Sequence, residues 1–314
     1  FYTFSQSQKG KQYDLGFGKL IEWDIPLLDG YDYTFIKNVS KKPGTYHFNG
    51  IVNPDLVKII EEWNPDGLLI FGWSFKSHLA CMRYFKNKVP IYFRGDSTLL
   101  NETFGLKKII RTIFLKWVYQ HIDFAFFVGS QNKLYYLRHG IKMEQLFFAP
   151  HAVDNKRFSE NNTEFSNTAD EWKMNLNISK DEIVFLYAGK LESVKNVELI
   201  IKVANKLKEL PIQIIIVGNG KLEDELKHKA ETNNKIHFLE FKNQSEMPVV
   251  YRLGDVFILP SKSETWGLSI NEAMACGKAV LVSNKCGCAI DLVQDGKNGY
   301  IFNSGDEMDL LRKA

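Results

Sequence analysis

A chain of 314 residues is long enough for two domains of about 150 residues, each with a hydrophobic core of its own. Hydrophobic residues make up 45% of the chain and charged residues 25%, which excludes a disordered protein. The net charge of +3 is too small for a nucleic-acid-binding protein, although residues 1–155 hold nineteen Lys/Arg against fourteen Asp/Glu. This basic half is a weak indication of an anionic surface or substrate.

The location of the protein is also indicated by what the chain lacks. No apolar run reaches the ~18 residues of a membrane span. The first residues lack the charged segment of a signal peptide. Four cysteines in a chain of this size indicate no disulfide framework. We therefore predict a cytoplasmic protein.

The first half alternates between strands and helices. Short apolar runs beside turn residues predict strands at residues 33–36, 68–71, 89–93, 124–128 and 146–148. Between them the pattern predicts helices at residues 53–63, 74–85, 106–120 and 131–139. Asn53-Pro54 is a typical helix start, with a cap residue followed by Pro at the first helical position.

The second half repeats this alternation. Strands are predicted at residues 183–188, 212–217, 236–239, 256–259 and 279–282, and helices at residues 194–210, 222–231, 245–253 and 268–276. Continuous apolar runs such as 212–217 are typical of parallel strands buried on both faces.

Two such blocks predict an α/β fold with two doubly wound domains that face each other across a cleft. We place the domains at residues 1–155 and 156–314, with the polar stretch 155–177 at the boundary. The chain starts inside a predicted strand without Met and ends inside a predicted helix. Both ends are therefore expected to be truncated.

In the first half, Arg94 and Asp96 follow a predicted strand at its carboxyl end. They form either a structural ion pair or Asx-turn, or a polar pair that faces the cleft and binds sugar hydroxyls or an acceptor.

The helix predicted next, at Leu106–Tyr119, contains four cations and no acid. Such a helix either lies on an anionic membrane surface or packs its apolar face on the sheet and solvates its charges. We favour packing.

Two lysines stand on the loop and helix start after the strand 183–188. Lys190 and Lys195 near a helix N-terminus are unfavourable for the helix dipole unless an anion lies between them. The alternative is a pair of solvated surface lysines. After the next strand, Gly218 and Gly220 begin a dinucleotide fingerprint, but position 223 is Glu where a third Gly is required. The tight turn remains, and it lets the backbone approach a ligand closely.

The most informative segment joins a strand to a helix between residues 255 and 277. Glu264 lies in the loop and Glu272 eight residues later on the helix. The amides of Thr265, Trp266, Gly267 and Leu268 open that helix, and such an end binds anions. Carboxylates for hydroxyls beside amides for phosphate suit a sugar nucleotide. The alternative for the two Glu residues is a complement to the helix dipole and a solvated side chain.

Patterns for other chemistries are missing from the sequence. No Asp-x-Asp loop, His-x-x-x-His or Cys/His spacing calls for a metal, so we predict no metal and no cofactor. Cys286 and Cys288 could form half of a metal site but are better explained as small buried residues. No nucleophile elbow and no Walker motif occur.

These motifs occur in the order seen in a known enzyme family. Residues 180–303 resemble the donor domain of the retaining group 1 glycosyltransferases (family 4), which have the glycosyltransferase B fold of two Rossmann-like domains. The resemblance lies in Gly189-Lys190 with Lys195, Val217-Gly-Asn-Gly220, His237-Phe-Leu, residues 255–261, Glu264 to Glu272, residues 273–277 and 295–299. The first half is similar more loosely, through residues 93–96, 123–130 and 149–154.

The resemblance implies a role for each matching position. Glu264 would bind hydroxyls of the donor sugar and Glu272 the ribose. Lys190 and Lys195 would hold the diphosphate together with the amides of residues 265–268. Phe241 would border the base. Asp96 lies where the family often has a polar residue facing the sugar.

Three departures from the family pattern stand out. Lys190 replaces an Arg and so loses bidentate geometry. His151-Ala152 replaces Asn-Gly. The family's first strand with its Gly-rich loop would precede Phe1, and its closing helix would follow Ala314.

The function predicted from these residues is retaining, metal-independent transfer of a sugar from a nucleotide-diphosphate sugar to a saccharide or lipid-linked acceptor, in bacterial polysaccharide or glycolipid synthesis. Contact with the inner face of a membrane would use Leu106–Tyr119. The alternatives are a nucleotide-sugar epimerase on the same fold and a non-catalytic nucleotide-sugar-binding protein.

Overall fold

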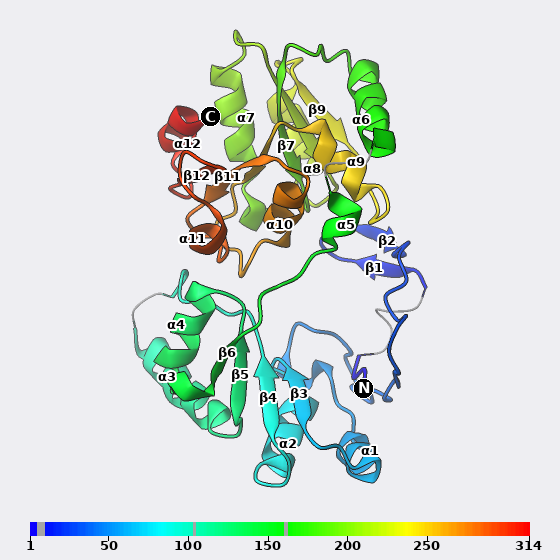
Figure 1. Ribbon diagram of the computed structural model, residues 1–314, viewed down its shortest axis with the longest axis vertical. Helices are drawn as coiled ribbons and strands as arrows, with labels where there is room; N and C mark the ends of the chain where they lie inside the picture. Colours follow the sequence, from blue (N-terminus) through cyan, green and yellow to red (C-terminus); the bar gives the residue numbers. More distant parts are fainter. Residues whose placement is uncertain (5–9, 103–104, 160–162) are drawn as a thin grey trace. The chain divides into compact units, whose positions relative to one another are not determined.

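The computed structural model describes residues 1–4, 10–102, 105–159 and 163–314. The chain divides into two compact units (Figure 1). The first comprises Phe1–Gln12 and Pro26–Pro150, and the second Tyr13–Ile25 and His151–Ala314. The sequence predicted two continuous domains with one boundary near residue 155. It did not predict that residues 13–25 belong to the second unit.

The first unit is built on a four-stranded parallel sheet in the order β3-β4-β5-β6. Its elements are α1 (Leu56–Trp63), β3 (Leu68–Phe71), α2 (Lys76–Phe85), β4 (Ile91–Arg94), α3 (Leu106–Tyr119), β5 (Phe124–Phe127), α4 (Ser130–Arg138) and β6 (Leu146–Phe148). The described strands pair in chain order. A core of aromatic and aliphatic side chains packs against them, including Met82, Phe93 and Leu115.

Helix α3 departs from the packing that the sequence favoured. Only Leu115, Val118 and Tyr119, in its last turns, are buried. Its earlier aliphatic residues are 58–79% exposed; they are Leu106, Ile109, Ile110 and Ile113. The apolar face of α3 is wider than the surface of the first unit that it packs against. Much of this face is therefore exposed to solvent beside the cations.

The strand predicted at residues 33–36 does not form. Phe35 makes only an isolated bridge with Tyr2, through bonds from Tyr2 N to Thr34 O and from Ile36 N to Tyr2 O, each 2.9 Å long. A strand needs a partner that pairs over several residues, and among the residues that the structure describes only Tyr2 pairs with this segment.

The second unit contains a six-stranded parallel sheet in the order β12-β11-β10-β7-β8-β9. Its strands are β7 (Ile183–Ala188), β8 (Ile212–Val217), β9 (Ile236–Leu239), β10 (Val256–Leu259), β11 (Ala279–Ser283) and β12 (Gly299–Phe302). The chain steps outward from β7 to β9 and then returns to the other side of β7 at β10. This reversal makes the unit doubly wound, as the sequence predicted.

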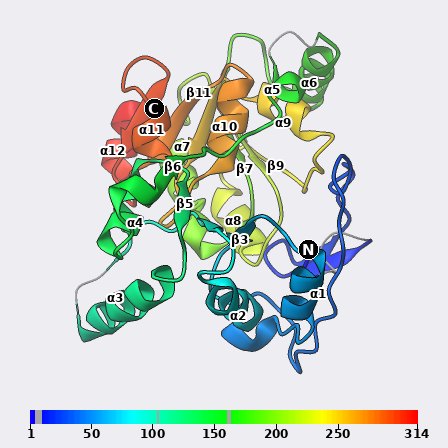
Figure 2. The same cartoon turned by 60° about the horizontal axis from the view of Figure 1, so that its bottom comes forward.

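Helices cover both faces of this sheet. They are α5 (Asn155–Phe158), α6 (Thr163–Asn175), α7 (Glu198–Lys206), α8 (Glu223–Ala230), α9 (Met247–Leu253), α10 (Leu268–Ala275), α11 (Ala289–Leu292) and α12 (Glu307–Lys313). Helix α7 packs with α8 and α12, while α6 lies beside α9 (Figures 1 and 2). The helix α6 forms inside the stretch that its polar composition marked as a boundary, because packing against α9 supplies the stability that its weak periodicity does not indicate.

Another difference lies after β7, where one helix was predicted at residues 194–210. A 3-10 turn spans Ser193–Lys195 and ends at Asn196, whose φ of 55° is left-handed. Helix α7 starts only afterwards. Asn tolerates this conformation, and the break gives Lys195 a place on the loop rather than on the helix.

The segment that joins the second unit from the start of the chain is a two-stranded hairpin, β1 (Gln12–Asp14) and β2 (Lys19–Ile21), drawn in blue in Figure 1. The carboxylate of Asp14 accepts bonds from the amides of Gly16 (2.8 Å) and Phe17 (3.0 Å), which shapes the turn. The sequence analysis predicted no element here.

We expect Gly299→Ala to lower the free energy of unfolding, because a Cβ at residue 299 would lie 2.0 Å from the carbonyl oxygen of Val280 on β11. The neighbour is backbone and cannot move aside, so about 1–3 kcal/mol should be lost to overpacking. Gly305→Ala is the matched control, since residue 305 also has a positive φ, of 80°, but has open space around it. Equal losses in urea titrations of the two variants would contradict the expected clash.

Candidate donor site

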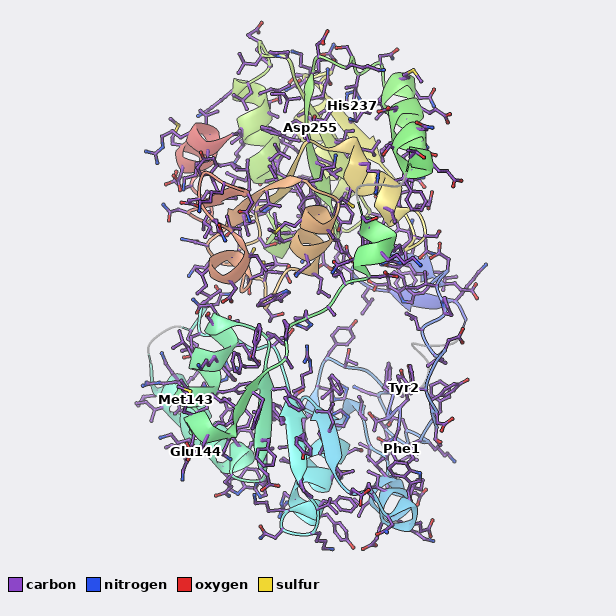
Figure 3. All side chains as sticks on the ribbon, viewed as in Figure 1. Phe1, Tyr2, Met143, Glu144, His237 and Asp255 are labelled. Atoms are coloured by element: carbon purple, nitrogen blue, oxygen red, sulfur yellow. The ribbon has the colours of Figure 1, made fainter. Side chains whose placement is uncertain are left out.

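The candidate site lies where the strand order of the second unit reverses. The loops after β7 and β10 follow neighbouring strands, yet lead to helices on opposite faces of the sheet. Such a reversal leaves a crevice outside the carboxyl ends of the strands, where open α/β sheets bind ligands. At the amino end of the same strands, the Asp255 carboxylate accepts a bond from Val184 N (2.8 Å) and ties β10 to β7 (Figure 3).

Lys195 and Glu264 meet across this crevice. The ammonium group of Lys195 donates to Oε2 of Glu264 in a close ion pair. Their side chains keep 24% and 19% of their exposure, so the pair remains accessible to a ligand. One predicted phosphate-binding cation and the predicted sugar-binding carboxylate therefore lie side by side, although they are 69 residues apart.

The loop that carries Glu264 is held by a second segment, at residues 285–288. Glu264 N donates to Lys285 O and Gly287 N donates to Glu264 O, both at 3.0 Å. Cys288 N donates to Trp266 O, also at 3.0 Å. Cys286 and Cys288 are buried here, and burial raises the pKa of the Cys288 thiol to about 12. The two cysteines thus support the loop, as their interpretation as small buried residues predicted.

The four residues after Glu264 lead into α10. Gly267 occupies the N-cap position with a φ of 101° and, as a glycine, has no side chain that could cap the helix. Trp266 is 5% exposed and its Nε1 donates to Asn271 Oδ1 (2.8 Å), whereas Leu268 is 43% exposed. Thr265 lies between Glu264 and this buried Trp. An uncapped helix start has free N–H groups and the positive end of the dipole, which suit an anion.

Three glycines keep the neighbouring loops close together. A Cβ on Gly218 would lie 2.0 Å from Gly189 O, and one on Gly220 would lie 2.5 Å from Leu191 O. A Cβ on Gly189 would lie 3.0 Å from the Tyr187 hydroxyl oxygen. The loops after β7 and β8 therefore pack backbone to backbone.

Beside these glycines lies a cavity of about 160 Å³. Its lining combines predicted donor residues with others that the sequence did not indicate; among them are Phe17, Trp23, Gly189, Gly218, Phe241, Tyr251 and Glu272. Glu272 projects from α10, and its Oε2 accepts a bond from the Tyr251 hydroxyl (2.6 Å). Phe241 follows β9, where its amide donates to Asn219 Oδ1 (2.8 Å).

Glu272 supplies a carboxylate to the lining of this cavity, and its pKa is shifted. Burial raises its pKa, and this effect outweighs the hydrogen bond from Tyr251 and the charge of Arg157, which lower it. A carboxylate held in this way gains from a hydroxyl donor, since a further hydrogen bond to its charged form offsets part of the desolvation.

Lys190 has a partner that the sequence analysis missed. Its ammonium lies 2.9 Å from Asp14 of the β1–β2 hairpin, with the two side chains 33% and 30% exposed. Burial raises the pKa of Asp14, but hydrogen bonds from Lys190 and from the Phe17 and Gly16 amides lower it by more, so the carboxylate is ionised. The two predicted phosphate-binding lysines therefore each face a carboxylate in the free protein.

Arg94 and Asp96 belong to the first unit. Arg94 donates through Nη1 to Ala149 O (2.9 Å) and through Nη2 to Pro150 O (3.3 Å), both in the segment that leaves β6. These bonds favour a structural role for Arg94. Burial raises the pKa of Tyr136, and the negative charge of Asp96 contributes in the same direction.

A larger cavity, of about 520 Å³, lies in the first unit beside β3. Its lining is mostly apolar and includes none of the predicted site residues. In the described ranges, no three His, Cys, Asp or Glu side chains are grouped to hold a metal ion. No helix in those ranges combines the length and apolar character needed to cross a membrane.

The residues that sequence reasoning missed are Asp14, Phe17, Trp23, Asn219 and Tyr251. A short-range signal existed for the first of these: Asp14, Gly16 and Gly18 lie between apolar residues, a pattern typical of a tight hairpin. The pattern could have predicted the hairpin, but not the loops against which it packs.

Comparison with known proteins identifies the family of the second unit. Residues 168–314 match the family model described as "Glycosyl transferases group 1". This region belongs to the group 1 glycosyltransferases. The resemblance drawn from its motifs is thereby confirmed for the region that contains Lys190, Glu264 and Glu272.

Relatives of known name share this group 1 region. The chain is 35% identical over 131 residues to the sulfoquinovosyl transferase SQD2 of Arabidopsis thaliana. The aligned region covers 41% of this chain and 25% of that protein. The chain is 30% identical over 142 residues to the alpha-monoglucosyldiacylglycerol synthase of Acholeplasma laidlawii, covering 43% and 35%. The matches thus span about a quarter to a third of the length of these relatives.

Solved structures extend the similarity to both units. The structure of Anabaena Alr3699/HepE in complex with UDP and glucose aligns with 89% of this chain and 74% of that chain, at a TM-score of 0.64 and 17% identity. The predicted fold is confirmed: the protein has the α/β glycosyltransferase B fold.

The raised pKa of Glu272 predicts a pH-dependent effect on stability. The folded protein disfavours the ionised carboxylate, so stability is lost as the pH rises from the ordinary pKa of 4.5 through the folded value. We expect Glu272→Gln to gain unfolding free energy over wild type progressively as the pH rises from the ordinary pKa of 4.5 through the folded value.

Urea titrations of both proteins across this range would measure the gain. Glu144→Gln serves as the control, because the Glu144 side chain is 71% exposed, on the first unit (Figure 3). A difference for Glu272→Gln that stays constant with pH, or that shrinks as the pH rises, would contradict the prediction.

Proposed function

We propose that this protein transfers a sugar from a nucleotide-diphosphate sugar to an acceptor hydroxyl, with retention of configuration and without a metal ion. The observation that supports this most is the Lys195–Glu264 pair at the strand-order reversal, beside the uncapped start of α10. It offers a carboxylate for sugar hydroxyls, and a cation beside the start of α10 for phosphate, within one crevice. The group 1 family match and the UDP and glucose bound to HepE support the same donor class.

Each predicted residue has a role in this proposal. Glu264 binds hydroxyls of the donor sugar and Glu272 the ribose, while Lys190, Lys195 and the amides of residues 265–268 hold the diphosphate. Charge that develops on the departing diphosphate is then stabilised by groups already in position. The two lysines supply the positive charge for which many transferases use a metal. Gly189, Gly218 and Gly220 let the backbone come close to the ligand.

The proposed stereochemistry follows from what lies near the sugar site. Glu264 contacts Lys195 and is assigned to hydroxyl binding in this proposal, so we assign no residue as a covalent nucleophile. The acceptor then attacks from the side of the leaving diphosphate, which retains configuration. On the acceptor side, Asp96 faces the sugar in this proposal, and Arg94 positions the segment after β6 through its two carbonyl contacts.

The acceptor class is proposed from α3 and from the relatives. Exposed aliphatic residues alternate on α3 with Lys107, Lys108, Arg111 and Lys116, and this composition suits an anionic lipid surface. The monoglucosyldiacylglycerol synthase among the relatives is named for a lipid product. We therefore propose a lipid-linked or saccharide acceptor in glycolipid or polysaccharide synthesis, at the cytoplasmic face of a membrane.

Two substitutions test the assigned function. Glu264→Gln should reduce sugar transfer strongly without weakening affinity for the bare nucleoside diphosphate, because that ligand has no sugar to bind. Glu272→Gln should weaken nucleotide and donor alike, since the ribose contact is common to both ligands. Calorimetry with the nucleoside diphosphate, together with incorporation of labelled sugar into an acceptor, would measure both effects.

The same assays separate the alternatives. A panel of nucleotide-diphosphate sugars in a thermal-shift experiment first identifies the donor, because a bound ligand raises stability. Isomer formation without an acceptor would identify an epimerase, and binding without turnover a non-catalytic protein. Equal effects of the two substitutions on nucleotide affinity would show that the roles of the carboxylates are wrong.

A separate prediction concerns α3. Binding to vesicles should require anionic lipid and fade with added salt, because each Lys or Arg near the surface contributes about 1 kcal/mol that ions screen. Ile110→Glu combined with Ile113→Glu should abolish it, whereas Leu134→Glu on α4, a residue 50% exposed, should not. Equal sedimentation with neutral vesicles, or none at low salt, would contradict membrane contact through α3.

A further inference from the structure

The β1–β2 hairpin, taken here together with the residues that follow it as far as Ile25, is bound to the rest of the second unit by polar contacts along its length. The Asp24 carboxylate accepts bonds from the amide (3.1 Å) and the hydroxyl of Ser245. Asn243 Nδ2 donates to Glu22 O (2.6 Å), and Lys19 Nζ donates to Asn219 Oδ1 (2.9 Å). The hairpin is thereby placed on the loops after β8 and β9, whose strands border the candidate site.

These contacts bring two hairpin aromatics to the predicted base-binding residue. The rings of Phe17 and Phe241 meet edge to face with centroids 4.8 Å apart, and those of Trp23 and Phe241 lie 6.3 Å apart. Phe17 and Trp23 also line the cavity that contains Glu272. Trp23 is still 38% exposed, which is high for the largest apolar side chain in a packed cluster.

From this placement we propose that Phe17 and Trp23 bind the base of a nucleoside diphosphate, so that the hairpin forms one wall of the nucleotide site. The inference rests on the proposed function and extends it to two residues outside the group 1 region. Aromatic faces bind bases of any kind by stacking, which is worth about 1–3 kcal/mol per base. Glu272, across the same cavity, is then within reach of the ribose that the base carries.

The hairpin also acts on the phosphate end of the ligand. Asp14 pairs with Lys190 at 2.9 Å, and the Lys190 ammonium lies 4.9 Å from the centroid of the Phe17 ring. A diphosphate that binds Lys190 competes with Asp14 for it. The hairpin therefore strengthens binding of the base through its aromatic rings and weakens binding of the phosphates through the Asp14 carboxylate.

The opposite effects of the aromatic rings and of Asp14 on ligand affinity can be tested, and a purely structural role of the hairpin would not produce them. Calorimetry is carried out on the full chain with UDP, ADP and GDP and with inorganic pyrophosphate. Trp23→Ala and Phe17→Ala should each weaken the tightest nucleoside diphosphate about tenfold, from loss of stacking, and leave pyrophosphate affinity unchanged. Asp14→Asn should strengthen both ligands. Tyr13→Ala, at a hairpin residue that is 60% exposed and outside the cavity lining, is the matched control and should change neither.

A second readout covers variants that fold poorly. Stacking of a base on Trp23 should quench tryptophan fluorescence when UDP or another tight nucleotide binds. Trp23→Phe keeps an aromatic wall, so it should bind that nucleotide within about threefold of wild type while losing the quench.

The outcomes distinguish failure of the aromatic wall from failure of the proposed function. If wild type binds a nucleoside diphosphate, Lys195→Ala weakens it, and the Phe17 and Trp23 variants bind like wild type, the wall is refuted and the proposed function stands. If the Phe17 and Trp23 variants lose affinity for the nucleotide and for pyrophosphate to the same extent, the hairpin has only a structural role. That result would also refute base binding by these two residues. If wild type binds none of the nucleotides tested, the proposed function fails and the inference with it.

Discussion

The reversal of strand order between β7 and β10 is the constraint on which the candidate site depends. Right-handed crossovers place successive helices on one face while the chain steps one way, and on the other face once it steps back. The loops after these two strands must therefore diverge, and no connection fills the space between their carboxyl ends. Lys195 and Glu264 come from the two diverging loops, so their contact is a result of topology rather than of proximity in sequence.

In the second unit, the positive charges of the candidate site are balanced by carboxylates in the absence of a ligand. Lys195 faces Glu264 and Lys190 faces Asp14, and all four side chains keep between 19% and 33% of their exposure. Ion pairs at such partly exposed positions contribute little to stability. A ligand with two phosphates can therefore replace the carboxylates around the lysines at small cost to the fold. The charges of both lysines are neutralised by carboxylates, yet both lysines remain accessible to a ligand.

The two carboxylates of the site differ because their surroundings differ. Glu264 lies in a loop supported by residues 285–288 and contacts a cation. Glu272 lies in the cavity on α10 and has a neutral hydroxyl, that of Tyr251, as its closest partner. Burial then raises the pKa of Glu272. Positions eight residues apart thus offer one charge-compensated group for a sugar and one desolvated group that gains from a hydroxyl donor.

The sequence by itself determined the strands of the second unit, because a parallel strand buried on both faces must be a continuous apolar run, as in β7 and β8. It also indicated Glu264, Glu272 and the glycines of the turns as candidate site residues, since these patterns depend on residues close together in the chain. Tertiary structure alone decided that α6 forms, that the apolar face of α3 is left largely exposed, and that Asp14, Phe17 and Trp23 join the donor unit. Each of these outcomes depends on the partner that a segment meets across the fold. Local periodicity and spacing contain no information about that partner.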